Sequence, residues 1–442
     1  MITIARKIST TIENWVTNSR RKVLLLRGAR QVGKTYVVRK AGERFKHFLE
    51  INFLSDTSAR TFFDGDLDVE RITEKLAAFY RVPIVDGETL LFFDEVQACP
   101  RALEALRFFY EKRPNLHLIA SGSLLEFALA ELPSFGVGRV QSMYLYAVSF
   151  DEFLLAAGER GLVDYLQEAG PKKPSGPALH GKFLDYLKTY LFLGGLPEVI
   201  ATFLTNKDYQ AITQLLDTLR RSYEDDFAKY RGRVPEARLQ EVFQSTAVQS
   251  ARKFVHSHAY PDASAKQVAQ AIELLSCAGI VHKVYHSSSN GVPLGGEIDN
   301  KKFKAMPFDH GVYQRMVGST IAELVHPKFD PINKGALAEV YAGAALLANS
   351  DPLVLEKLFY WHRESKSSNA EVDYVISVDG DVIPIEIKAA TKGRMQSLQR
   401  FVEEKKSNIA IRCSMEDFGR FENILVVPLY AISQIPRLVR AR

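Results

Sequence analysis

The chain contains 442 residues, more than one hydrophobic core usually organises, so we expect roughly two to four domains. Hydrophobic residues make up 46% of the chain and aromatic residues 11%, a composition that excludes extended disorder. The net charge of +5 is compatible with a nucleic-acid partner but is too small to indicate one by itself.

The cysteines and the N-terminus narrow the class of protein further. Cys99, Cys277 and Cys413 lie far apart without a CxxC spacing, which favours structural thiols over a disulfide framework or a zinc site. The apolar run Val23–Leu26 is followed at once by Arg27, so it is too short for a signal peptide. We therefore expect a cytoplasmic protein with no membrane-bound segment.

The first part of the chain, residues 1–168, has the pattern of an α/β domain. Short apolar runs alternate with helical patterns, as expected of parallel strands joined by crossover helices. The expected strands cover 22–27, 89–93 and 117–120, and the expected helices cover 34–41 and 101–110.

A middle region is expected from 180 to 330. It follows Ala169–Ala178, a stretch rich in proline and glycine in which we place a domain boundary. The region begins with helices that a turn at Gly194–Pro197 interrupts.

Farther on, Asp262 or Ser264 is expected to cap a helix that ends near Gly279, before a strand at Ile280–His286. This order fits a winged helix, and it equally fits other α+β cores.

The segment Gly28–Thr35 has the sequence GxxxxGKT between an expected strand and an expected helix, which predicts an ATP-binding phosphate loop. Lys34 is expected to reach the β and γ phosphates, and Thr35 to hold magnesium. The expected ATP-contacting residues are Gly28, Ala29, Arg30, Gln31, Val32, Gly33, Lys34, Thr35 and Asp94.

A second buried strand ends in the acids Asp94 and Glu95. Phosphoryl transfer requires positioning and charge neutralisation, so Asp94 is expected to join Thr35 in the magnesium shell and Glu95 to activate the attacking water. The pair favours ATP hydrolysis over simple binding.

Two further polar residues are candidates for this site. Ser121, preferred over Ser123, ends the next strand and is expected to sense the γ-phosphate. Arg139 is a candidate to neutralise transition-state charge, in cis or from a second copy of the chain, or else an ordinary surface arginine. A role in trans would require a homo-oligomer.

The last part of the chain, residues 331–442, offers a second candidate site. Asp373 on one expected strand and Glu386 and Lys388 on the next would converge if they share a face, and the acids could then hold magnesium for attack on a phosphodiester. Glu339 lies in an otherwise apolar helix and could join them. The alternative is a hairpin with a structural Asp/Glu–Lys salt bridge.

The motifs GARQVGKT, LFFDEVQ, ASGSLLE, GRV with SFDEFL, and LGGLPE with EVDYV and IEIK together resemble a family of prokaryotic AAA-type ATPases. The resemblance implies an N-terminal AAA-type ATPase domain, a middle helical region with a winged helix, and a C-terminal domain similar to PD-(D/E)xK restriction-type nucleases. The proline of the nuclease motif is Val372 here.

Three functional hypotheses follow. The first is an ATPase that acts on DNA and couples its nucleotide state to a magnesium-dependent nuclease-like domain. The second is a nucleotide-gated regulatory or interaction protein whose terminal domain is catalytically silent. The third, a small-molecule kinase, is disfavoured because a kinase rarely needs the acid pair and such a long C-terminal extension.

Overall fold

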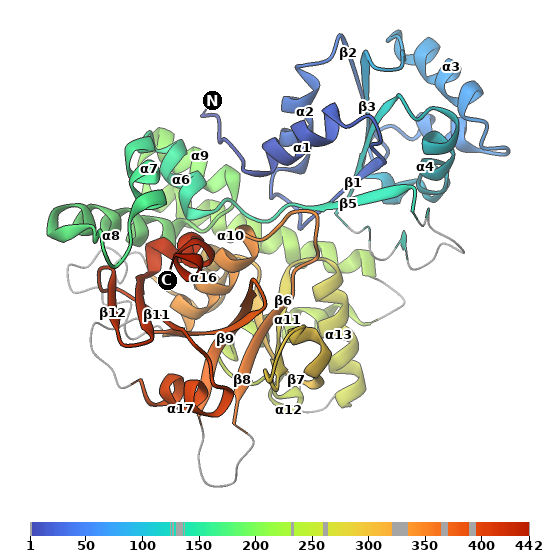
Figure 1. The fold of residues 1–442 in the computed structure, drawn as a ribbon. Helices are drawn as coiled ribbons and strands as arrows, with labels where there is room; N and C mark the ends of the chain where they lie inside the picture. Colours follow the sequence, from blue (N-terminus) through green and yellow to red (C-terminus); the bar gives the residue numbers. More distant parts are fainter. Residues whose placement is uncertain are drawn as a thin grey trace.

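The computed structural model describes residues 2–123, 125, 128–129, 136, 138–230, 234–259, 264–320, 335–363, 370–388 and 395–441. Its N-terminal part contains a parallel five-stranded sheet in the order β2-β3-β4-β1-β5 (Figure 1). The strands are β1 (Val23–Arg27), β2 (His47–Asn52), β3 (Thr89–Asp94), β4 (His117–Ser121) and β5 (Val140–Tyr144). The accompanying helices are α1 (Ile8–Thr17), α2 (Lys34–Gly42), α3 (Val69–Tyr80) and α4 (Pro100–Lys112).

Strand β1 is buried on both faces of this sheet. Leu24 and Leu26 belong to one hydrophobic cluster and Leu25 to another, as side-chain alternation along a strand requires. The expected α/β architecture of the N-terminal part is confirmed.

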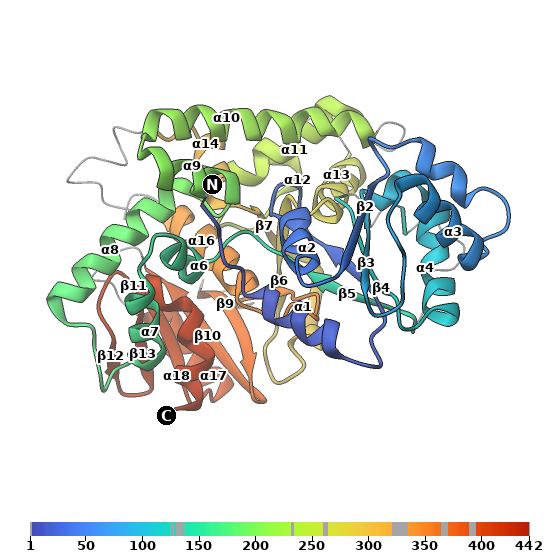
Figure 2. The same ribbon diagram turned by 90° about the horizontal axis from the view of Figure 1, so that it is seen from above.

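Helices dominate the chain from Phe150 to Cys277. Figure 2 shows α10 running along one side of the molecule, from the neighbourhood of α9 toward the blue N-terminal part. The helices are α6 (Phe150–Ala156), α7 (Arg160–Glu168), α8 (Gly176–Leu193), α9 (Pro197–Asn206), α10 (Tyr209–Asp225), α11 (Glu236–Val248), α12 (His256–Ala259) and α13 (Ala265–Cys277).

The stretch Ala169–Ala178 differs from the loose linker expected from its composition. Ala169 and Ser175 are buried, and the backbone N–H groups of Ser175 and Gly176 donate to Asp417 at 3.1 and 2.8 Å. Helix α8 begins inside the stretch, because a proline in the first helical turn needs no hydrogen-bond donor.

The described C-terminal strands form a mixed eight-stranded sheet in the order β12-β13-β11-β10-β9-β8-β6-β7. Its strands are β6 (Val281–Ser287), β7 (Ile298–Pro307), β8 (Leu358–His362), β9 (Glu371–Val378), β10 (Asp381–Ile387), β11 (Ala410–Ser414), β12 (Gly419–Phe421) and β13 (Ile424–Pro428). The helical elements here are α14 (His310–Met316), α16 (Gly335–Ala348), α17 (Gln396–Lys405), the 3-10 helix η6 (Leu429–Gln434) and α18 (Ile435–Arg440).

The antiparallel hairpin β6–β7 belongs to this larger sheet, because β6 also pairs in parallel with β8. This one sheet therefore contains strands from both the expected middle region and the expected C-terminal domain. The order α13, β6, β7 matches the expected winged-helix order, and Ser264 caps α13 with Gln267; Asp262 lies outside the described residues. The winged-helix assignment stays a prediction.

One hydrophobic cluster connects all parts of the molecule. It includes Leu26 of β1, Phe153 of α6, Leu216 of α10, Tyr341 of α16 and Ile385 of β10. Among the described helices, none is long and apolar enough to cross a membrane.

Candidate functional site

The phosphate loop connects β1 to α2 and depends on two glycines. Gly28 has φ +149°, and a Cβ there would lie 2.2 Å from the carbonyl oxygen of Leu145, so no side chain fits. Gly33 has φ +97° and precedes the first residue of α2. Helix α2 thus begins at the loop and points its N-terminal N–H groups into it, the geometry that binds phosphate.

Lys34 is buried and folds back over the loop. Its ammonium group donates to the carbonyl oxygens of Gly28 and Ala29 at 3.0 and 2.8 Å. Burial lowers the pKa of Lys34 to about 8, against the opposing attraction of Glu95 and Asp94. The ammonium group of such a lysine interacts more strongly with a charged phosphate than with its neutral carbonyl partners.

Asp94, at the end of β3, accepts hydrogen bonds from both neighbouring elements. Thr35 donates to its Oδ2 at 3.0 Å, and Ser121 of β4 donates to its Oδ1 at 2.5 Å. The arrangement follows from the sheet, since β4 lies between β3 and β1 and the carboxyl ends of parallel strands share an edge. Ser121 is fully buried and positions Asp94 here; its expected contact with the γ-phosphate stays a prediction.

Glu95 follows Asp94 in a left-handed conformation with φ +49°, which is uncommon for a residue other than glycine. Its Oε2 accepts from the Gln97 amide at 2.5 Å and from the Ser123 hydroxyl at 3.3 Å. Strained residues of this kind concentrate at functional sites. The two contacts hold the carboxylate beside Asp94 and the phosphate loop.

The residues around Asp94 fit a magnesium ion accompanied by nucleotide. Thr35 and Asp94 supply a hydroxyl and a carboxylate oxygen side by side, and Mg²⁺ prefers oxygen ligands, taking few from protein and the rest from phosphate and water. The hydrogen bond from Thr35 to Asp94 holds these two oxygens 3.0 Å apart.

Arg30 of the phosphate loop contacts the middle region, a role that the sequence did not reveal. Its guanidinium group pairs with Asp226, just after α10, and donates to Ser123 at 3.2 Å. The Tyr223 hydroxyl of α10 donates to the Arg30 carbonyl oxygen at 3.2 Å. The C-terminal end of α10 therefore rests on the loop.

Arg139 lies away from this site within the chain. It immediately precedes β5, whereas β5 reaches the phosphate-loop edge of the sheet at its other end, where Tyr144 pairs with Arg27. Its side chain is half-exposed and forms an ion pair with Glu111 at 2.9 Å. This geometry does not support a role in cis; a role in a second copy of the chain stays a prediction.

A cavity of about 280 Å³ lies next to the phosphate loop. Its lining includes Gly28 and Ala29 of the loop, Gly279 at the end of α13, and His282 of β6. A Cβ on Gly279 would lie 3.3 Å from the Ala29 nitrogen, so the α13–β6 turn packs closely against the loop. Burial lowers the pKa of His282 to about 4.

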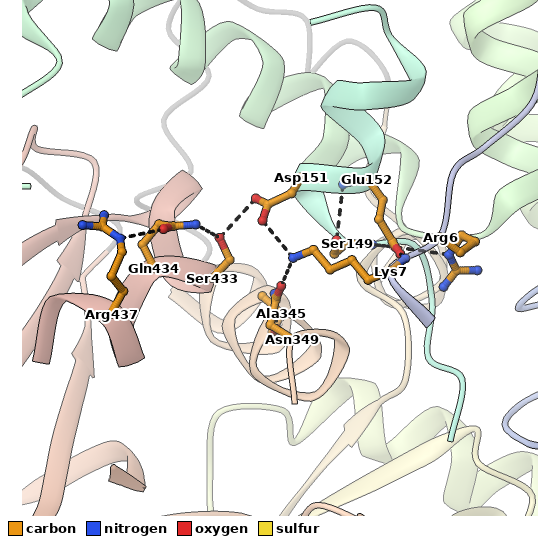
Figure 3. A network of polar contacts seen from close by, with 10 residues as sticks. All are labelled: Arg6, Lys7, Ser149, Asp151, Glu152, Ala345, Asn349, Ser433, Gln434 and Arg437. Atoms are coloured by element: carbon orange, nitrogen blue, oxygen red, sulfur yellow. Dashed lines mark hydrogen bonds and ion pairs between the residues drawn. The ribbon is translucent and has the colours of Figure 1, made fainter. Parts of the chain in front are cut away.

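Arg6 holds the phosphate loop from the N-terminal side. It donates to the carbonyl oxygens of Val32 and Tyr146 at 2.8 and 2.7 Å and pairs with Glu152 of α6 at 3.2 Å. Glu152 also completes a capping box with Ser149 at the start of α6 (Figure 3). The SFDEFL motif thus builds a helix terminus that faces the loop.

The same helix contacts the C-terminal domain. Lys7 donates to Asp151 of α6 at 2.9 Å and to Asn349, just after α16, at 2.5 Å. Asp151 in turn accepts from Ser433 of η6 at 3.1 Å, and Figure 3 shows the chain of contacts continuing toward α18. We call Arg6, Lys7, Asp151, Glu152 and Ser433 the α6 junction.

The candidate residues of the C-terminal domain lie together. Asp373 Oδ2 accepts from the Ile387 N–H at 2.7 Å, and Lys388 pairs with Glu386 at 2.8 Å. Burial raises the pKa of Asp373, Glu386 and Glu339, with Lys304 or Lys388 opposing the shift. The sequence therefore identified residues that the fold brings together.

Lys304 of β7 lies among these acids, and sequence reasoning missed both Lys304 and its partner Glu371. Its ammonium group lies 2.7 Å from Glu339, 2.6 Å from Glu371 and 3.8 Å from Asp373. The residue is 2% exposed, so its charge is desolvated and offset by these acids. We call Glu339, Glu371, Asp373 and Glu386 the C-terminal carboxylate cluster.

In the part of the chain that the structure describes, no group of three or more His, Cys, Asp or Glu residues is arranged to hold a metal ion. The described cysteines Cys99, Cys277 and Cys413 are free thiols.

Two solved structures from archaea are similar to this chain at low identity. The Walker-type ATPase PABY2304 of Pyrococcus abyssi is 16% identical, with a TM-score of 0.44, and the match covers 71% of this chain and 96% of that one. The Signal Transduction ATPase with Numerous Domains (STAND) protein with a tetratricopeptide repeat sensor, PH0952 from Pyrococcus horikoshii, is 10% identical, with a TM-score of 0.30. That match covers 79% of this chain and 46% of that one. At this level neither structure fixes the chemistry of this chain.

Sequence families match three successive segments, and comparison with curated proteins gives no match. Residues 184–322 and 334–432 match two domains of unknown function, DUF8612 and DUF4143. Residues 20–154 match an AAA domain. The phosphate loop, the parallel sheet and this match together show that the N-terminal part of the chain is an AAA-type P-loop domain.

Proposed function

We propose that this protein is an ATPase whose nucleotide state is relayed to the C-terminal domain. The observation that carries the first half is the Asp94 carboxylate, which joins Thr35 of the phosphate loop to Ser121 of the neighbouring strand, with Glu95 beside it. This arrangement presents a phosphate cradle, a magnesium site and a carboxylate base on one edge of a sheet.

Each residue has a distinct role in the proposed reaction. Lys34 would exchange the carbonyl oxygens of Gly28 and Ala29 for the β and γ phosphates, and Thr35 and Asp94 would hold Mg²⁺, which would supply charge neutralisation. Glu95 orients a water molecule and accepts its proton as the water oxygen bonds to the γ-phosphorus and the bond from that phosphorus to the ADP oxygen breaks, which releases ADP and phosphate. Gln97 and Ser123 keep the Glu95 carboxylate in place.

The test is ATP turnover by the Glu95→Gln variant. We expect turnover to fall by about 100-fold or more, because general base catalysis is lost, while ATP binding persists. Glu88→Gln is the matched control, since Glu88 is exposed and lies at the opposite end of the same strand. Turnover near the wild-type rate in Glu95→Gln would exclude this role for Glu95.

The second half of the proposal rests on contacts that leave the loop in two directions. Arg30 reaches α10 through Asp226, and Arg6 reaches α6 through Glu152. The α6 junction extends from Arg6 to Ser433 of η6 and contacts Asn349 through Lys7. A change in the loop on ATP binding would alter the partners of both arginines, which favours a nucleotide-gated regulatory protein.

Action on DNA is the second candidate function. The convergence of Asp373, Glu386 and Lys388 favours a nuclease-like domain, for which DNA would be the substrate. This candidate predicts that DNA binds and stimulates ATP turnover; cleavage of DNA would require the C-terminal carboxylates to accept Mg²⁺ or Mn²⁺. If the protein neither binds nor cleaves DNA under any nucleotide condition, action on DNA is excluded and the regulatory function is the remaining proposal.

A further inference from the structure

The resemblance to nucleases implies a divalent metal in the C-terminal carboxylate cluster, and the residues present do not fit one. A hard divalent cation needs several carboxylate oxygens free to approach it closely. Here Asp373 Oδ2 accepts from Ile387, and its Oδ1 faces Lys304 at 3.8 Å. Glu386 Oε1 is paired with Lys388.

The ammonium group of Lys304 lies where a cation bound to these acids would lie. Its ammonium group contacts Glu339 and Glu371 at 2.7 and 2.6 Å, from two different elements, α16 and β9. It also lies 5.2 Å from the centre of the Tyr360 ring. A metal ion would therefore stand beside a buried positive charge that water does not screen.

The charge on Lys304 is secure under ordinary conditions. Burial alone would lower its pKa, but attraction by Glu339, Asp373 and Glu371 outweighs burial and raises it. The neighbouring acids therefore favour the charged form of Lys304.

One carboxylate oxygen of the cluster accepts no hydrogen bond from the described residues. Of its fully buried carboxylate oxygens, Glu386 Oε2 alone lacks a hydrogen-bond partner among the described residues, and the residue is only 4% exposed. A buried carboxylate oxygen without a partner is unfavourable, and it is the kind of group a bound cation would satisfy.

From these contacts we infer that Lys304 takes the place of a divalent cation in the C-terminal carboxylate cluster and keeps this cluster from binding Mg²⁺ or Mn²⁺. The domain is then held as a metal-free module by a residue that β7 contributes. Removal of the Lys304 side chain converts the part of the cluster that Lys304 contacts, Glu339, Glu371 and Asp373, into a metal site. This inference does not depend on ATP hydrolysis, because its test uses nucleotide-free protein.

The test is a titration of the full-length protein with Mn²⁺ in the absence of nucleotide. Electron paramagnetic resonance measures the free Mn²⁺ at each step of the titration. Lys304→Ala is expected to bind one Mn²⁺ per chain about tenfold more tightly than wild type, or better, because a competing charge is gone. Lys304→Arg should behave as wild type, since it retains the charge. Lys302→Ala, on the same strand, is the matched control.

The double variant Lys304→Ala/Asp373→Asn should lose the gained Mn²⁺ binding, which locates the ion in the cluster. A folded Lys304→Ala protein that gains no Mn²⁺ binding would overturn the inference. If Lys304→Ala does not fold, wild type and Asp373→Asn decide the matter. Equal Mn²⁺ binding by these two supports the inference, and Mn²⁺ binding by wild type that Asp373→Asn abolishes contradicts it.

Discussion

At the scale of single residues, the two ends of the molecule use buried charge differently. Lys34 is held by backbone carbonyl oxygens that a ligand can replace, whereas Lys304 is held by carboxylates that carry the opposite charge. The first arrangement leaves the ammonium group ready to exchange partners, and the second fixes it.

His282 gives a pH-dependent prediction at this scale. Burial places its pKa near 4 in the folded protein, below the ordinary value of 6.5, so the unfolded chain takes up a proton first as the pH falls. The contribution of a neutral His282 to stability is therefore present above pH 6.5 and lost between 6.5 and 4. We expect His282→Gln to reduce this acid destabilisation, by at most about 3 kcal/mol.

The measurement is urea unfolding of wild type and His282→Gln at neutral pH and near the folded pKa. His258→Gln, at an exposed position, serves as the control. An unchanged acid dependence in His282→Gln would show that this ring does not titrate between the two states.

Residue motifs near one another in sequence were predictable, and distant partners were not. Gly28–Thr35 and the Asp94–Glu95 pair lie in contiguous motifs whose chemistry dictates their spacing. The contacts of Arg6 with Val32 and of Lys304 with Glu371 depend on how separate elements pack, which no local pattern encodes. A lysine between Phe303 and Ala305 was the one available signal for Lys304.

At the scale of elements, the short helix α6 connects the N-terminal segment to the C-terminal domain. Ser149 and Glu152 cap it, Glu152 pairs with Arg6, and Asp151 faces Lys7 and Ser433. Both ends of the relay that we propose therefore meet on the first turn of one helix.

Glu152→Gln separates the capping role from the charge role. Glutamine can still complete a capping box, so the loss reflects mainly the buried Arg6 left without its anion, about 3 kcal/mol of unfolding free energy. Ser149→Ala, which removes the cap alone, is expected to cost about 1 kcal/mol. Chemical unfolding measures both values. Equal, small losses in the two variants would mean that the Arg6–Glu152 pair contributes little to stability.

Elements with a strong pattern were predicted closely, and those without one were missed. Helices α2 and α4 and strands β3 and β4 lie within one or two residues of the expected boundaries, because apolar periodicity or a short apolar run defines them. Strand β5 was missed because polar residues interrupt VQSMY at Gln141 and Ser142 and the strand forms a sheet edge, and β12 because it is only three residues long.

At the scale of the whole molecule, the expected domains pack closely against one another, and their boundaries stay a prediction. The β6–β7 hairpin joins the C-terminal sheet, α10 rests on the phosphate loop, and one hydrophobic cluster runs from β1 to β10. Composition located the segments but could not reveal that they share a core, because pairing between distant strands leaves no local signal.

A shared core makes mechanical separation of the parts costly, so movement is expected at polar contacts instead. The Lys7–Asp151 pair of the α6 junction and the Arg30–Asp226 pair are polar and partly exposed. These contacts can exchange partners while the apolar packing stays intact.

The central claim, that nucleotide state is relayed from the phosphate loop to the C-terminal domain, is tested most directly by hydrogen exchange of the Glu95→Gln protein with and without ATP and Mg²⁺. The account predicts that ATP changes exchange in α2, in α6 and in η6 and α18 across Leu429–Arg440, while β12 at the far sheet edge stays unchanged. Changes confined to residues 20–154 in an ATP-saturated protein would contradict it.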